Sequence, residues 1–270
     1  MAFVHNQGLS ISFEDIGAGP PVVLGHSFLC SGNMWCGQVP ALTGKFRVLN
    51  LDFRGHGRSG AVTRAFSLYD AVSDVVAVLD ELGIEKAVWC GLSIGGMIAL
   101  RAALTCPQRV NGLILLDTDA GAETPLRKLR YYGMGLGARL LGIGPFLSPI
   151  ARLMFGATTR QQNPTLVSEW KREFSTVNIP SVLRGLDALM QRDSLLARLP
   201  QISVPALVLV GKEDRSLPPS LARRIHDLLP DSSLVQVPAA GHLSALEQPA
   251  AVTEAILDFL ETRIYKGVAT

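Results

Sequence analysis

The chain has 270 residues, of which 48% are hydrophobic and 18% charged, and its formal net charge is +2. This apolar content is ample for a packed core and argues against a disordered chain. The small net charge argues against a nucleic-acid partner, and the length suits one large α/β domain with or without an insertion.

Short apolar strands and amphipathic helices alternate along the first part of the chain. We expect strands in LSISFEDIG, PVVLGHS, FRVLNLDF, KAVWCG and VNGLILLDT, and helices in SLYDAVSDVVAVLDELGI and MIALRAALTCP. The first of these helices has leucines and valines on one face, with Ser67 as its expected N-cap and Gly83 as its expected C-cap.

Residues 120–199 break this alternation, because they contain several helix-like pieces and no clear strand. They hold eleven Lys and Arg against five Asp and Glu, so they are basic relative to the rest of the chain. The alternation resumes with strand ALVLVG, helix SLARRIHDLL, strand SLVQVP and helix PAAVTEAILDFLETRI. We therefore expect one α/β core domain, residues 1–119 and 200–270, carrying a helical insertion of residues 120–199.

Continuous apolar strands separated by helices predict a mostly parallel sheet covered by helices on both faces. Ligands bind such sheets at the carboxyl ends of the strands. We expect no metal or other cofactor, because His and Cys are scattered and neither H-E-x-x-H nor a dinucleotide fingerprint is present.

The four cysteines show neither C-x-x-C spacing nor a disulfide-dense frame, which indicates a reduced, cytoplasmic protein. The first residues, MAFVHNQGLSISFEDIG, lack the basic start and long apolar run of an export signal. No apolar run approaches the ~20 residues of a membrane-spanning helix. The sequence leaves a homo-oligomer open.

The stretch GLSIGG lies between an expected strand and an expected helix, and its glycines suit neither element. A G-x-S-x-G segment in this context is a nucleophile elbow, in which a tight turn exposes the serine at a helix N-terminus. Gly91 and Gly95 prevent clashes between strand and helix. We therefore predict that Ser93 is a catalytic nucleophile.

A serine nucleophile needs a base, and the base needs an orienting acid, in the chain order Ser, Asp or Glu, His. Asp214 follows a late apolar strand, and His242 follows the next strand in a small-residue loop. Three other carboxylates remain alternatives for the acid: Glu213, Asp117 and Asp119.

An oxyanion formed during acyl transfer needs two N–H donors. The residue after the nucleophile, Ile94, supplies one. The loop LGHSFLCSGNMW follows an early strand, and Phe28 in this loop is the expected second donor. Trp35 is expected either to wall the substrate pocket or to pack in the core.

The motifs GHSF, LDFRGHGRSG, GLSIGG, LVGKEDRSLP and GHLSALEQP, in this order, resemble the α/β-hydrolase fold serine hydrolases. The likeness is greatest to the bacterial esterase, enol-lactonase and cofactor-free haloperoxidase branch. It covers nearly all of the chain outside the insertion, and it implies that the insertion is a cap over the active site. One departure is Ser27, because this family usually has glycine directly after the histidine of the first motif, which is His26 here.

The resemblance implies hydrolysis of a small carboxylic ester or lactone through an acyl-enzyme. Cleavage of carbon–carbon or amide bonds and perhydrolysis remain alternatives on the same residues, and a non-catalytic ligand receptor is a further one. The apolar stretch YYGMGLGARLLGIGPFLSPIARLMFG predicts a hydrophobic substrate, with Leu140 and Phe146 in the pocket. Core packing is the competing interpretation of these side chains.

Overall fold

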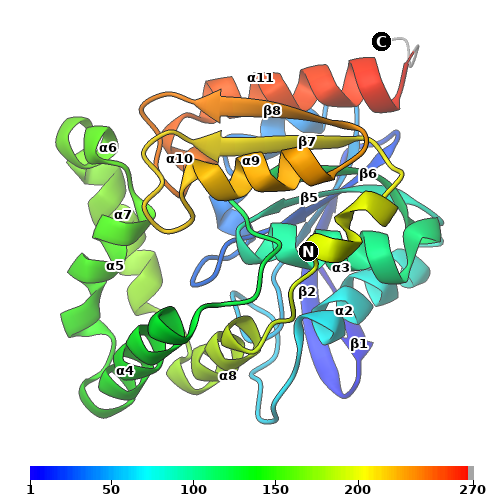
Figure 1. Cartoon of the computed structure of the whole chain (residues 1–270). Helices are drawn as coiled ribbons and strands as arrows, with labels where there is room; N and C mark the ends of the chain where they lie inside the picture. The colour runs from blue at the N-terminus through cyan, green and yellow to red at the C-terminus, as the bar shows by residue number, and fades with distance from the viewer. Residues whose placement is uncertain (267–270) are drawn as a thin grey trace.

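A single eight-stranded sheet forms the centre of the computed structural model, which describes residues 1–266 (Figure 1). The strands are β1 (Ala2–Asn6), β2 (Leu9–Ile16), β3 (Pro21–Gly25), β4 (Arg47–Leu51), β5 (Ala87–Leu92), β6 (Val110–Leu116), β7 (Ala206–Gly211) and β8 (Ser232–Val237). Their order is β1-β2-β4-β3-β5-β6-β7-β8. In this order every neighbouring pair from β4 onward, β3 included, is parallel, whereas β2 is antiparallel to both β1 and β4. This mostly parallel sheet confirms the predicted fold class, and β1 is the strand that the sequence analysis missed.

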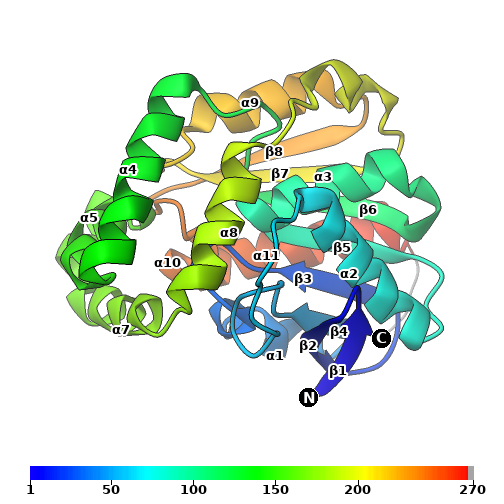
Figure 2. The same ribbon diagram turned by 90° about the horizontal axis from the view of Figure 1, so that it is seen from below.

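Helices cover both faces of the sheet (Figures 1 and 2). They are α1 (Val39–Leu42), α2 (Leu68–Glu81), α3 (Ile94–Thr105), α4 (Pro125–Leu141), α5 (Leu147–Met154), α6 (Ala157–Gln162), α7 (Pro164–Ser175), α8 (Ile179–Met190), α9 (Pro219–Leu228), α10 (Ser244–Glu247) and α11 (Pro249–Phe259). Helix α2 begins after Ser67, whose backbone N–H donates to Asp70 Oδ2 at 2.7 Å, and Gly83 follows its end with a φ of 65°. The N-cap therefore lies where the sequence analysis put it, whereas the C-cap is Leu82, one residue before the predicted Gly83.

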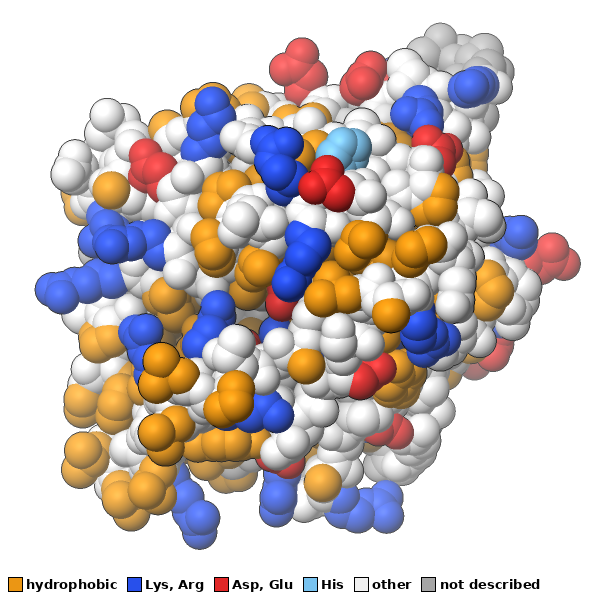
Figure 3. All heavy atoms as spheres, viewed as in Figure 1, with side chains coloured by type: hydrophobic (Ala, Val, Ile, Leu, Met, Phe, Trp, Pro, Cys, Tyr) orange, Lys and Arg blue, Asp and Glu red, His pale blue; other side chains and the backbone are white. Residues whose placement is uncertain are grey.

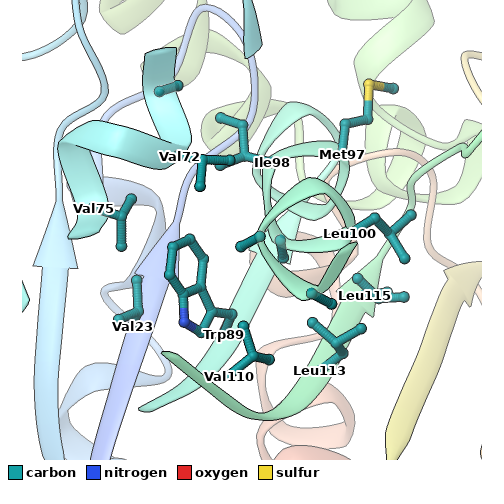
Figure 4. Close-up of a cluster of buried hydrophobic side chains, with 14 of the residues drawn as sticks. Val23, Val72, Val75, Trp89, Met97, Ile98, Leu100, Val110, Leu113 and Leu115 are labelled. Carbon is teal, nitrogen blue, oxygen red and sulfur yellow. The ribbon is translucent and has the colours of Figure 1, made fainter. Parts of the chain in front are cut away.

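Side chains alternate between the two faces of each strand, which divides the core into two layers. Trp89 and Val23 point toward α2 and α3 and pack with Val75 and Ile98 (Figure 4). Val88, the neighbour of Trp89, belongs to the opposite layer, which packs under α1 and α11. Strands apolar on both faces are what a sheet buried on both sides requires.

Helices α4 to α8, which we call the insert, connect β6 to β7 and lie to one side of the sheet (Figures 1 and 2). Helix α4 packs against α8, and α5 against α7. The insert is helical, as the sequence analysis expected for residues 120–199, whereas its division from the core domain stays a prediction. In the described part of the chain, we find no helix with the length and apolarity needed to span a membrane.

Candidate active site

Ser93 lies at the sharp turn between β5 and α3 and has a strained backbone, with φ 56° and ψ −113°. A side chain on Gly91 would collide with the backbone of Gly95, and one on Gly95 would collide with the carbonyl of Gly25. Positive φ at a residue other than glycine is costly and persists only where surrounding contacts impose it. Glycine is therefore required on both sides of Ser93 for strand and helix to approach this closely.

Hydrogen bonds with Leu116, at the end of β6, and with Thr118, just after it, hold this turn in place. The backbone N–H of Ser93 donates to the carbonyl of Leu116 at 2.8 Å, and the hydroxyl of Thr118 donates to the carbonyl of Ser93 at 2.6 Å. The Ser93 side chain lines a cavity that His242 also lines. The elbow thus presents Ser93 to the same space as the candidate base.

His242 and Asp214 form a buried hydrogen-bonded pair, with 2.8 Å between His242 Nδ1 and Asp214 Oδ2. The other carboxylate oxygen of Asp214 accepts from the N–H groups of Ser216 and Leu217, at 2.8 and 2.9 Å, which fixes its orientation. Burial by itself lowers the pKa of His242, but the charges of Asp214, Asp117 and Glu247 outweigh it and raise the pKa above the usual 6.5.

The three alternative carboxylates have other partners. Glu213 accepts from the backbone N–H and hydroxyl of Thr158. Asp119 pairs with Arg192 at 3.3 Å and Arg224 at 3.1 Å. Asp214 is thus the carboxylate that the structure places on His242.

Asp117, the remaining alternative, accepts from the N–H of Gly211 at 2.8 Å and bonds to the hydroxyl of Ser244. Burial and the neighbouring Asp214 raise its pKa well above the usual value. Gly211 ends β7 just before the Asp214 loop, and Ser244 follows His242 by two residues. Asp117 therefore links the loop that carries Asp214 to the loop that carries His242.

The expected oxyanion donors lie on two loops that end at the same cavity. Ile94 is the first residue of α3, where helix N–H groups have no acceptor within the helix. Phe28 lines the cavity, and among residues 1–266 its N–H donates to no protein atom. The hydroxyl of Ser27, at the position of the family's usual glycine, is buried there without a partner in the described chain.

His26 fixes the loop that carries Phe28. Its Nε2 accepts from the N–H of Phe53 at 2.8 Å, so its Nδ1 carries the proton and donates to the carbonyl of Ser27 at 2.7 Å. Burial lowers the pKa of His26 to about 4, which keeps the ring neutral. The histidine of the GHSF motif is thus a positioning residue for the loop.

The cavity above Ser93 encloses about 130 Å³ and is walled by both the core and the insert. Its apolar wall includes Met97, Met134, Phe146, Leu153, Val182, Leu186 and Met190. Phe146 is at the wall, where the sequence analysis expected it. The α8 side chains were missed, although the spacing of Val182, Leu186 and Met190 marks one face of a helix.

Two expected pocket residues lie elsewhere. Trp35 is fully buried in the core layer under α1 and α11, so its assignment to the pocket was wrong and the core-packing alternative holds. Leu140 is also wrong as a pocket residue, because it lies on the outer face of α4 with 72% of its surface exposed. Neither side chain contacts the cavity.

Two carboxylates join the insert to the catalytic loops. Glu247 is buried and accepts from the N–H groups of Gly156, Gly241 and Leu243, at 2.8, 2.9 and 3.2 Å. Gly156 belongs to the insert, whereas Gly241 and Leu243 flank His242. Glu213 makes the second junction, through Thr158. In the described residues, no cluster of His, Cys, Asp and Glu is arranged to hold a metal ion.

Comparison with known proteins places this fold in one family. The profile of the alpha/beta hydrolase fold matches residues 20–249, so the chain belongs to that family. It is similar to a thermophilic esterase from Thermogutta terrifontis, at 30% identity with 97% of each chain covered and a TM-score of 0.92. It is also similar to an enol-lactonase from Burkholderia xenovorans, at 27% identity over 96% of this chain and 99% of that one, with a TM-score of 0.90.

A curated relative, the pimeloyl-[acyl-carrier protein] methyl ester esterase of Nitrosomonas europaea, is 30% identical over 89% of this chain and 95% of its own. The names of other relatives include carbamate hydrolase and non-heme bromoperoxidase. The family thus defines a hydrolase, and the bond that it cleaves has to be argued from the site.

Proposed function

We propose that this protein hydrolyses carboxylic esters, open-chain or cyclic, that carry a hydrophobic group of small to medium size. One observation carries the proposal: Ser93 and His242, which is hydrogen-bonded to Asp214, line a cavity whose wall is mostly apolar. Each buried CH₂ group of a substrate gains ~0.8 kcal/mol, or roughly fourfold in binding, from such a wall.

In the proposed mechanism, Ser93 Oγ attacks the ester carbonyl while His242 Nε2 takes its proton. Asp214 holds the Nδ1 proton and so keeps Nε2 free to act as the base. The N–H groups of Phe28 and Ile94 stabilise the oxyanion. His242 then protonates the leaving alcohol and activates the water that releases the acid.

The charged groups at the cavity favour an uncharged substrate. Arg127 pairs with Glu123 at 3.1 Å, and Arg192 pairs with Glu123 and Asp119 at 3.2 and 3.3 Å. Their charges are therefore compensated within the protein, and an anionic substrate would have to compete with these partners. The basic excess of the insert accordingly does not select for a carboxylate in the pocket.

The test is a substrate series with purified protein. We expect kcat/KM to rise severalfold per added carbon from p-nitrophenyl acetate to hexanoate, and likewise for γ-lactones of increasing side-chain length. Ser93→Ala should remove nearly all turnover without changing the circular dichroism spectrum. Higher kcat/KM for a carbamate or a vinylogous diketone than for the best ester, or turnover by folded Ser93→Ala, would contradict the proposal.

A further inference from the structure

Helix α4 exposes an unusual number of large apolar side chains. Of the nine such side chains exposed in residues 1–266, six lie on its 17 residues, and its leucines are 58–77% exposed. They are Leu126, Leu129, Tyr132, Leu136, Leu140 and Leu141. Exposed apolar groups gathered in this way mark interaction sites on soluble proteins.

The exposed leucines and the cavity lining occupy opposite faces of the same helix. Tyr131, Met134 and Ala138 line the catalytic cavity. With about 3.6 residues per turn, Leu126, Leu129, Leu136 and Leu140 fall together on the other side. We call these four residues the leucine face. Helix α4 is apolar on both sides, yet only its inner side is covered by protein.

Basic side chains border the leucine face on both edges. Arg130 lies along one edge, and Lys128 and Arg139 lie along the other. Within residues 1–266, none of the three forms an ion pair. Figure 3 shows Lys and Arg among the hydrophobic side chains at the lower left, over α4.

Two acidic side chains close to α4 do not pair with these basic groups. Glu123, before α4, pairs with Arg127 and Arg192. Asp187 on α8 accepts from the neutral Tyr132 hydroxyl at 2.9 Å, and within residues 1–266 it forms no ion pair with the basic side chains of α4. The edges of the leucine face therefore keep their positive charge, and the face is complementary to an apolar surface bordered by anions.

We propose that the leucine face docks α4 on an anionic lipid surface, with Leu126, Leu129, Leu136 and Leu140 in the acyl boundary and the basic edges at the headgroups. An apolar stripe with Lys and Arg on its borders is the pattern of helices that lie in a membrane interface. A second copy of the chain fits less well, because a twofold pairing of the leucine faces would bring the two sets of basic edges together.

Docking of this kind would place α4 between the lipid and the catalytic cavity. The inner face of the helix lines the cavity, and the outer face contacts the bilayer. Docking does not depend on which bond the enzyme cleaves, so it can be tested separately from the proposed activity.

The experiment measures sedimentation of the full chain with vesicles of 1:1 phosphatidylglycerol and phosphatidylcholine, and with phosphatidylcholine alone. We expect partitioning to the anionic vesicles that falls with added salt, and weak binding to the neutral ones. Removing the basic edges with Lys128→Gln, Arg130→Gln and Arg139→Gln should weaken partitioning about 100-fold, since each basic group contributes roughly fivefold.

A leucine-face variant, Leu126→Ser with Leu129→Ser and Leu136→Ser, should also lose binding, yet hydrolyse a short soluble ester at the wild-type rate. The matched control, Phe3→Ser with Ile16→Ser, removes exposed apolar groups from β1 and β2 and should bind as wild type does. Failure of the wild type to bind anionic vesicles overturns the proposal. Equal vesicle binding by the control variant and the leucine-face variant also overturns it. The proposal fails as well if the wild type forms a soluble dimer that does not bind vesicles and the leucine-face substitutions dissociate that dimer.

Discussion

Replacing Glu247 with glutamine tests the junction between the insert and the His242 loop. Glu247 Oε1 accepts two N–H groups, from Gly241 and Leu243, and Oε2 accepts one, from Gly156. A glutamine keeps one acceptor oxygen and turns the other into an N–H₂ donor. Its best orientation keeps the two bonds at Oε1 and sets the new donor against the N–H of Gly156.

The expected loss follows from that one unsatisfied group. A buried N–H without an acceptor costs about 1–3 kcal/mol. For a chain of this size each kcal/mol shifts the melting temperature by roughly 2–4 °C. Glu247→Gln should therefore lower the Tm by about 2–12 °C, measured by circular dichroism at neutral pH.

Glu213→Gln is the matched control, because it changes the other carboxylate that joins the insert to the core. Glu213 bonds the N–H and the hydroxyl of Thr158. A hydroxyl can turn from donor to acceptor, whereas a backbone N–H cannot. Glutamine at 213 can thus keep both contacts, and the Tm should change by less than about 2 °C. Equal losses in the two variants, or an unchanged Tm in Glu247→Gln, would refute this reasoning.

Three further predictions concern the active site and the pocket. Asp214→Asn should lower kcat by roughly 10³–10⁴-fold, since the asparagine favours the wrong imidazole tautomer, and Asp117→Asn by less than about tenfold; the reverse ranking in steady-state kinetics would move the acid to Asp117. The pKa of His242 is raised above 6.5, and the imidazole must be neutral to act as the base. We therefore expect kcat/KM to be maximal at pH values above that raised pKa and to fall as the pH drops through it. A pH profile of kcat/KM that stays flat down to pH 5 would contradict this. Phe146→Ala should lower kcat/KM for a hexanoate ester severalfold, whereas Leu140→Ala should not, and equal effects in a chain-length assay would contradict the cavity lining described above.

The regular part of the fold could be predicted from the sequence because its central strands are apolar on both faces and outer helices such as α2 and α9 have a clear apolar stripe. β1 was missed because only Val4 of its five residues is buried, so the segment AFVHN carries no strong pattern. Pairing with β2 decides its structure, and such a tertiary contact is not written in the local sequence.

The candidate catalytic residues could be proposed from the sequence because each follows a strand, and because Ser93 lies between glycines that its tight turn requires. The pocket could not be predicted as well, because apolarity alone does not say which side of a helix faces the substrate. Phe146 and Leu140 belong to the same apolar stretch, yet one lines the cavity and the other is exposed. Helical spacing from Tyr131 and Met134 would have separated the two faces of α4.

Residues that hold the site, rather than react in it, explain why its strained geometry persists. Ser93 and Asp117 both have positive φ, a conformation that surrounding contacts must impose. The contacts come from buried polar groups beside the candidate catalytic residues: Thr118 bonds to the elbow, Asp117 bonds to both the acid and base loops, and Glu247 bonds to the loop of the candidate base. Because Glu247 also bonds the insert, displacement of the insert acts on the His242 loop through a shared carboxylate. A substitution at this junction should therefore alter stability and turnover together, even though Glu247 belongs to neither the pocket nor the reacting pair.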